Sequence, residues 1–268
     1  MNARAELRVR QPAVAGAFYP AGREALVGSL RECFAAAMPE GDIPTPKALV
    51  VPHAGFIYSG PVAASAYLHL VPGAASIRRV VVLGPSHRVS LRGMAVPSAD
   101  AFATPLGIVP IDVRGREAVL DLPGVQLNDE AHALEHSIEV QLPFLQFVLG
   151  SFELLPLAVG RCSTVEVVEV LDALWDDPDT LVVVSTDLSH YLSYEDANQA
   201  DSATTAKIVS AAFEDVRDTD ACGASALRGL LAAARIRGRT VEQLDVRNSG
   251  DTAGDRNRVV GYGAFAVC

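Results

Sequence analysis

Three short apolar runs stand out in the hydrophobic pattern of the chain, and each is followed closely by a histidine. The runs are ALVV at 48–51, VVVLG at 80–84 and LVVVS at 181–185. Each run is rich in β-branched residues and too short for a helix, so the pattern predicts three buried strands. In an open α/β sheet, ligands bind in the crevice at the carboxyl ends of the strands. We therefore expect His53, His87 and His190 to lie near one another at that edge.

Segments with helical spacing alternate with strand-like segments along the chain. The spacing of apolar residues predicts helices at 22–38, 61–70, 165–174, 194–216 and 227–235. Further strands are expected near 94–96, 107–111 and 152–159, with a closing pair at 241–246 and 259–267. The segment EHSIEVQLPFLQFVLG predicts a helix that is interrupted at Pro143 or begins anew there. This alternation predicts one α/β domain over residues 1–268, with a mostly parallel central sheet flanked by helices.

Composition and charge narrow the class of protein. The chain has 268 residues, with 22 Lys and Arg against 32 Asp and Glu, which gives a formal net charge of −10. This charge argues against non-specific binding to nucleic acid, which needs clustered basic residues. No apolar run approaches the roughly 18 residues that span a bilayer, and the first residues lack the apolar centre of a secretory signal. The four cysteines are scattered, as is typical of reduced thiols. We expect a cytoplasmic protein without membrane association.

His53 and His87 share a layout that suggests metal binding. His53 lies in PHAGFIYSG and His87 lies in GPSHR, each just beyond an apolar run. One histidine in such a turn more often only hydrogen-bonds the backbone, but two equivalent placements favour a pair of metal ligands. Two histidines and one carboxylate leave open positions on iron for oxygen and substrate. The late turn NSGDTAGD supplies Asp251 and Asp255 as candidate carboxylates, although such a turn also joins two strands without any metal.

The segment STDLSHY supplies a candidate acid–base pair. Asp187 and His190 are three residues apart, so they share a face on a helical turn. The carboxylate then orients the imidazole; alternatively, Asp187 caps the helix that follows and His190 is an ordinary residue of its first turn. His136 in EHSIEVQLPFL is a further candidate that contacts substrate or donates a proton, although its neighbours also suit a helix N-terminus.

Other candidates for chemistry are weaker. His132 and His69 are expected to be structural or to face solvent. Cys222 in DACGAS is conceivable as a nucleophile with His190 as its base, but a cysteine packed in the core at a helix start is the simpler interpretation. The sequence has no GxSxG elbow, no Walker A loop and no HExxH helix.

Several segments together resemble the Memo (mediator of cell motility) family, including its bacterial and archaeal members. The matching segments are, in order, RQPAVAGAFYP, PHAGFIYSGPVAASAY, VVVLGPSHR, EHSIEVQLPFLQ, STDLSHY, the pair Cys222–Gly223, and SGD with VVGYGA. They run from about Arg10 to the carboxyl terminus, so the resemblance covers nearly the whole chain. No one segment is specific, but the combination is.

The resemblance implies the fold of class III extradiol dioxygenases, the non-haem iron enzymes that open catechol rings. It also implies that His53 and His87 bind the metal, and that Asp187 and His190 belong to the family's third segment. In the ring-opening enzymes a histidine near that place is the acid–base catalyst, so the resemblance assigns this role to His190.

The third metal ligand implied by the resemblance is a cysteine in animal members of the family. Counting back from VVGYGA, we expect that position in the late turn at Thr252, with Asp251 beside it as an anionic ligand. Iron(II) is the expected metal.

The expected function is therefore a non-haem, metal-dependent oxidoreductase that acts on an unidentified small molecule. The alternatives are a non-catalytic protein that binds metal, peptide or a small ligand in the same crevice, and a metal-assisted hydrolase. Microbial members of the family are often grouped with an AMMECR1-like protein and a radical S-adenosylmethionine protein, so we expect a pathway shared with these two.

Overall fold

A nine-stranded mixed sheet forms the centre of the computed structural model, which describes residues 7–38 and 44–268. Its strands are β2 (Ala48–Val51), β3 (Arg79–Pro85), β4 (Met94–Val96), β7 (Val125–Leu127), β8 (Glu153–Val159), β9 (Thr180–Ser185), β10 (His190–Leu192), β11 (Val241–Asn248) and β12 (Val259–Val267). The order is β10-β12-β2-β9-β3-β8-β4-β7, and β11 pairs with β12.

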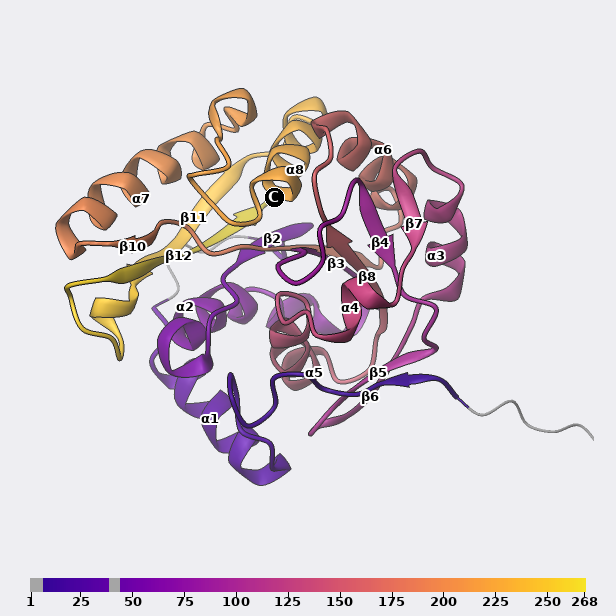
Figure 1. Cartoon of the computed structure of the whole chain (residues 1–268), viewed down its shortest axis with the longest axis horizontal. Coiled ribbons are helices and arrows are strands. Elements are labelled where there is room, and N and C mark those ends of the chain that lie inside the picture. Colours follow the sequence, from indigo (N-terminus) through magenta and orange to yellow (C-terminus); the bar gives the residue numbers. More distant parts are fainter. Residues whose placement is uncertain (1–6, 39–43) are drawn as a thin grey trace, which may run out of the picture.

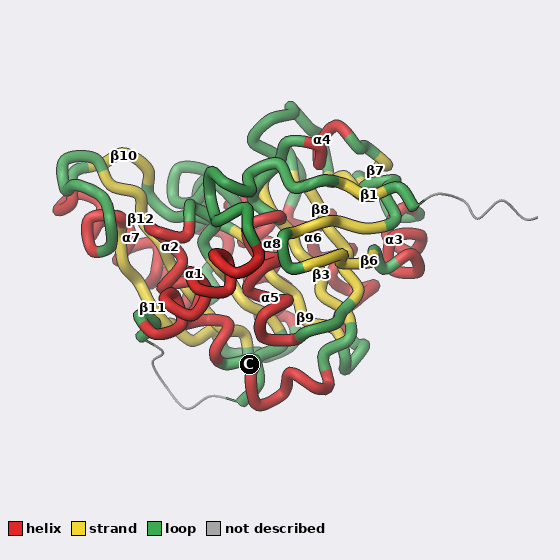
Figure 2. Tube along the Cα trace, turned by 90° about the horizontal axis from the view of Figure 1, so that it is seen from below, coloured by secondary structure: helices red, strands yellow, loops and turns green. Residues whose placement is uncertain are grey.

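Four neighbouring strands at the centre of the sheet run parallel. They are β2, β9, β3 and β8, and every residue of β2 and β9 is buried, as expected for strands that are covered on both faces. β12 pairs antiparallel with β2, so the C-terminus lies at the edge opposite the carboxyl ends of the parallel strands. In Figure 2 the loops gather at the upper edge and the C-terminus lies below. All four parallel strands therefore deliver their following loops to one edge.

Helices cover both faces of the sheet. The helices are α1 (Arg23–Ala35), α2 (Phe56–Leu68), α3 (Val113–Leu120), α4 (Glu130–Ala133), α5 (Leu142–Leu149), α6 (Thr164–Trp175), α7 (Tyr194–Val209) and α8 (Ala224–Ile236). Figure 1 shows α1, α2 and α5 on one side of the sheet and α6 and α8 on the other. Side chains of β2 alternate between two cores: Leu49 and Val51 pack with α1, α2 and α5, whereas Ala48 and Val50 pack with α6 and α8.

A small second sheet anchors the start of the chain. It consists of β1 (Val9–Arg10), β5 (Ala101–Thr104) and β6 (Gly107–Pro110), in the order β1-β5-β6. After β1, the buried carboxylate of Glu139 pairs with Arg10 and accepts hydrogen bonds from the backbone N–H groups of Ala13 and Val14 and from the Tyr19 hydroxyl. This network holds the segment that carries Phe18 against the sheet edge.

The predicted α/β fold with helices around a central parallel sheet is confirmed, and the differences are local. The helix expected at 61–70 begins earlier, at Phe56. Pro61 removes one backbone hydrogen bond from it. The helix nevertheless extends past Pro61 because the ring of Phe56 packs against Tyr19 and Phe144 in the core.

Two other helices differ in their bounds. The segment 135–150 forms a 3-10 turn at Glu139–Gln141 and then begins α5 anew, with Pro143 in its first turn, which was one of the two expectations. The helix expected at 194–216 ends at Val209, because Ala211 adopts a left-handed φ of 50°. No helix within the described ranges is long and apolar enough to cross a membrane.

Candidate metal centre

Two parallel strands deliver the first two histidines to one edge of the sheet. β2 ends at Val51 and His53 follows two residues later; β3 ends at Pro85 and His87 follows two residues later. β9 lies between these strands and pairs with both, so their carboxyl ends align. The two histidine positions predicted as metal ligands therefore share one edge.

His53, His87 and His136 form one group that can hold a metal ion. Their ligand atoms all lie within 4.8 Å of one another. The rings of His87 and His136 stack with centroids 4.8 Å apart, and His53 meets these two rings nearly edge-on at 5.3 and 5.4 Å. His136, which was expected to contact substrate or donate a proton, comes from the loop before α5 and is the third member of the group. Across the described ranges, no other such group of His, Cys, Asp and Glu side chains is found.

The carboxylate of Glu135 holds two of the imidazoles in place. Its Oε1 accepts a hydrogen bond from His87 Nδ1 at 3.0 Å and lies 3.2 Å from His136 Nδ1. Oε1 also accepts from the backbone N–H groups of His136 and Ser137 at 2.8 and 2.9 Å, and Oε2 accepts from the backbone N–H of His87 at 2.6 Å. Burial by itself would raise the pKa of Glu135, but the hydrogen bonds from His87 and Ser137 outweigh it and hold the pKa well below its usual range. Since a carboxylate only accepts, His87 carries its proton on Nδ1, and Nε2 keeps a lone pair for a metal.

A buried hydroxyl sets the tautomer of His53. Ser185 Oγ donates to the carbonyl of Ser137 at 2.6 Å and accepts from Gln141 Nε2 at 2.8 Å. His53 Nδ1 lies 2.9 Å from the same hydroxyl oxygen. Because the single hydroxyl proton is already used, His53 Nδ1 must donate, and Nε2 is left with its lone pair.

The environment favours neutral imidazoles. Burial lowers the pKa of His53 well below its ordinary value, and the neighbouring His87 and His136 lower it further. Burial likewise lowers the pKa of His136 to about 4, against the opposing effect of Glu135. Neutral imidazoles with a hydrogen-bonded carboxylate behind them are the donor set that transition metals such as iron and zinc take in proteins. The residues present therefore fit a divalent transition metal.

A thiol lies beside the histidine group. The Sγ atom of Cys222 is 3.4 Å from His53 Nε2 and accepts from the backbone N–H of Asp187 at 3.3 Å. Burial, and to a smaller extent the Asp187 carboxylate, raise the pKa of this thiol to about 12. The sequence predicts a core cysteine here, and the resemblance places the position of the family's cysteine ligand in the late turn. The thiol that contacts the histidines instead comes from the Cys222–Gly223 pair, just before α8.

Asp187 and His190 make separate contacts. Asp187 Oδ1 accepts from the backbone N–H of His53 at 2.8 Å. Burial raises the pKa of Asp187 to about 7, and that N–H acts in the opposite direction. His190 is exposed, with Nδ1 2.8 Å from the carbonyl of Leu188. The expected helical turn was wrong, because His190 begins β10 and α7 is capped by Ser193 rather than by Asp187.

The late turn places the carboxylate of Asp251 outside the histidine group. Its Oδ2 accepts from the backbone N–H of Asn248 at 3.0 Å, and its Oδ1 accepts from the Tyr194 hydroxyl at 2.6 Å. These contacts cap a 3-10 turn at Ser249–Asp251. The role of Asp251 as third metal ligand stays a prediction, and its present hydrogen bonds give it a different task.

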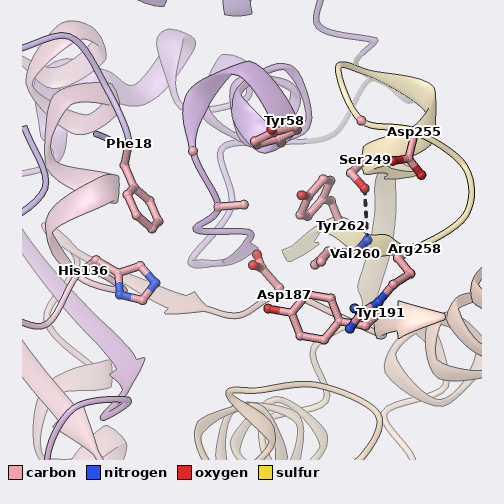
Figure 3. Close-up of a pocket in the computed structure, with 13 residues that line it drawn as sticks. Phe18, Tyr58, His136, Asp187, Tyr191, Ser249, Asp255, Arg258, Val260 and Tyr262 are labelled. Carbon is pink, nitrogen blue, oxygen red and sulfur yellow. Dashed lines mark hydrogen bonds between the residues drawn. The ribbon is translucent and has the colours of Figure 1, made fainter. Parts of the chain in front are cut away.

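A cavity of about 440 Å³ opens beside the histidine group. His136 and Asp187 line it, and in Figure 3 Phe18 and His136 lie on one side with Tyr191 and Tyr262 on the other. The Phe18 and His136 rings are 4.8 Å apart, so the aromatic wall continues onto the imidazole. This cavity gives a small molecule access to the group.

The group is also reached from a second side. A cavity of about 290 Å³ is lined by His87 and Cys222. His136 therefore lines the larger cavity and His87 lines the smaller one.

Several groups that shape the site lie at positions that the sequence pattern does not single out. Glu135 is one of the neighbours of His136 that suit a helix N-terminus, and the pattern gives no role to Ser185 or Gln141. The available signal was their polarity, because Ser185 ends an apolar strand and Gln141 stands among apolar residues. His132, which was expected to be structural or to face solvent, is buried with Nε2 2.9 Å from the Ala95 carbonyl, and burial lowers its pKa to about 4.

Comparison with known proteins identifies relatives of the whole chain. Residues 10–266 match the family model described as Memo-like protein. A MEMO1 family protein from Aquifex aeolicus is 37% identical, covering 96% of this chain and 98% of the relative, and one from Methanopyrus kandleri is 37% identical with the same coverage. The crystal structure of an uncharacterized protein from Escherichia coli K12 aligns with 82% of this chain and 99% of its own, at a TM-score of 0.47 and 14% identity. From the family match and these relatives, the chain belongs to the Memo family.

Proposed function

We propose that this Memo family chain is a non-haem, metal-dependent oxidoreductase that binds iron(II) at His53, His87 and His136. The observation that carries the proposal is the convergence of three imidazoles whose ligand atoms lie within 4.8 Å of one another. Glu135 and Ser185 support it, because they engage Nδ1 of His87 and His53 and leave Nε2 of each ring for a metal. A bound iron(II) ion would supply Lewis acidity and redox chemistry at this position.

The cavity beside the group supports a small organic substrate. Its volume of about 440 Å³ lies within the range of small-molecule sites. Substrate in this cavity contacts His136 and the Asp187 carboxyl, which the His53 N–H fixes in the wall. Because His136 belongs to the histidine group and also lines the cavity, a substrate bound there lies against the group, as chemistry at the group requires.

His190 suits the acid–base role. A carbonyl oxygen only accepts, so His190 Nδ1 donates to Leu188 and the neutral ring keeps its lone pair on Nε2. His190 itself lines neither cavity, but Tyr191 beside it lines the larger one, so in this role Nε2 would take a proton from a substrate at the rim of that cavity and return it later in the reaction. The Leu188 carbonyl, rather than Asp187, fixes the tautomer that this role requires.

Metal analysis of protein that is purified anaerobically under reducing conditions tests the metal centre. We expect stoichiometric iron in the wild type and its loss in His53→Ala and His87→Ala, with folding of each variant checked by circular dichroism. His190→Ala is the matched control, because this histidine lies outside the group and its removal leaves the iron in place. A wild-type protein that binds no transition metal under these conditions would overturn the proposal.

Oxygen uptake with a panel of catechols tests the oxidoreductase part. We expect uptake by the iron-loaded wild type, and a rate about 10²- to 10⁴-fold lower in His190→Ala at unchanged iron content. Iron-loaded wild type that consumes no oxygen with any catechol would contradict a ring-opening activity. Equal rates in wild type and His190→Ala would remove His190 from the reaction.

A further inference from the structure

The cavity beside the histidine group has aromatic walls and one basic side chain. Phe18, Tyr58, Tyr191 and Tyr262 line it, and Arg258 is the only Lys or Arg among its lining residues. Figure 3 shows Arg258 next to Tyr191, across the cavity from Phe18 and His136. Aromatic side chains that face each other across a cavity favour a flat ring between them.

Arg258 is held in position without a charged partner. Its guanidinium carbon lies 4.9 Å from the centroid of the Tyr191 ring. None of the ion pairs within the described residues includes it, and no side-chain hydrogen bond engages it there. Two acids also line the cavity: Asp255 Oδ1 accepts from the backbone N–H of Asn257 at 2.8 Å, and Asp187 Oδ1 accepts from the backbone N–H of His53 at 2.8 Å. The positive charge of Arg258 is therefore available to a ligand.

The backbone conformation of Tyr191, which positions its ring in this arrangement, is energetically unfavourable. Tyr191 has a φ of 61°, in the left-handed region, which costs a bulky non-glycine residue free energy. Its side chain remains 63% exposed, so burial in a core does not account for the conformation. This conformation places the Tyr191 ring at the cavity wall and under the guanidinium of Arg258.

We propose that this cavity binds a carboxylate that carries a flat aromatic ring, with the ring between Phe18 and the tyrosines and the carboxylate on Arg258. The inference rests on the proposed function in one respect, which is that the bound ring reaches the histidine group at His136. Guanidinium and carboxylate match as planar, bidentate partners, and stacking on an aromatic ring leaves the edge of the guanidinium free for that contact. The chain carries a net charge of −10, so an anion needs such a local cation to bind.

Calorimetric binding of three matched probes tests the ligand class. The probes are phenylacetate, its neutral amide phenylacetamide, and cyclohexylacetate, which keeps the carboxylate but lacks a flat ring. We expect wild-type protein to bind phenylacetate about tenfold or more tightly than either analogue, as expected for one charge-assisted contact and one aromatic slot. In Arg258→Gln the preference for the acid over the amide disappears.

Arg256 provides a matched control variant. It also lies over a tyrosine, with its guanidinium 4.3 Å from the centroid of the Tyr194 ring, and it belongs to the same turn, but it does not line the cavity. We expect Arg256→Gln to keep the full preference for phenylacetate. Equal losses in the two variants, an amide that binds as tightly as the acid, or no binding of any probe at millimolar concentration would each overturn the inference.

Measuring each affinity in metal-free and in iron-loaded protein separates this inference from the proposed function. Selective binding of phenylacetate by a protein that takes up no iron would overturn only the proposed oxidoreductase. Stoichiometric iron without any acid preference would overturn only the ligand class.

Discussion

Glu135 behind the histidine group and Asp251 in the late turn are two carboxylates that act differently. Glu135 is buried behind the imidazoles, where it accepts from His87 Nδ1 and from three backbone N–H groups. Asp251 is exposed and accepts from the backbone N–H of Asn248 and from the Tyr194 hydroxyl. The first carboxylate orients the imidazoles of the histidine group, whereas the second stabilises a turn. What a carboxylate does is decided by the donors that face it, which spacing along the chain does not reveal.

Replacing Glu135 by glutamine is the strongest test of this comparison. The amide is neutral and presents N–H donors toward His87 and the backbone, so the imidazoles lose their orienting acceptor. We expect the affinity for divalent metal to fall about 10- to 100-fold, measured by competition with a chelator. Glu130→Gln, the same change at an exposed position in α4, is the control and keeps wild-type affinity. An unchanged affinity in Glu135→Gln would show that the carboxylate does not organise the group.

Whether a residue directly follows a parallel strand explains how much of the site could be predicted from the sequence. His53 and His87 were predictable because short apolar runs identified β2 and β3, and parallel neighbours align their carboxyl ends. His136 reaches the group through a loop before α5, and Cys222 reaches it from just before α8. Neither follows a parallel strand, so only tertiary packing brings them to this edge.

The helical turn expected at Asp187 and His190 does not form, for a related reason. A spacing of three places two residues on one face only within a helix, and STDLSHY leads instead into the extended strand β10. The strand β10 forms by pairing with β12, which lies about 70 residues further along the chain. Local periodicity predicts local structure well, but it does not show which distant strand a segment will join.

His132 sharpens the comparison, because it is a buried imidazole outside the histidine group. Burial lowers its pKa to about 4, below the ordinary value of 6.5. Between those values the unfolded chain binds a proton that the folded chain excludes, so acid favours unfolding. We expect the free energy of unfolding to fall as the pH drops from about 6.5 toward 4, with His132 contributing up to ~1.4 kcal/mol per pH unit.

Chemical denaturation of metal-free protein at several pH values measures this contribution. His132→Gln removes the titrating group and keeps a side chain that can donate to the Ala95 carbonyl, so its stability should depend less on pH than that of the wild type. Parallel curves for the two proteins would contradict a buried neutral imidazole at this position. The acid sensitivity that remains in His132→Gln includes the contribution of the histidine group.

The smallest expected effect belongs to Asp251. Asp251→Ala removes the acceptor of two hydrogen bonds at an exposed turn, so we expect a loss of about 1 kcal/mol in the free energy of unfolding. Metal affinity should stay at the wild-type value, because the carboxylate already has its partners in the turn. Tyr194→Phe is the matched control, since it removes one of the two hydrogen bonds and leaves the carboxylate. If Asp251→Ala weakens metal binding while Tyr194→Phe does not, the carboxylate itself is a ligand, and the turn must rearrange to bring it to the histidines.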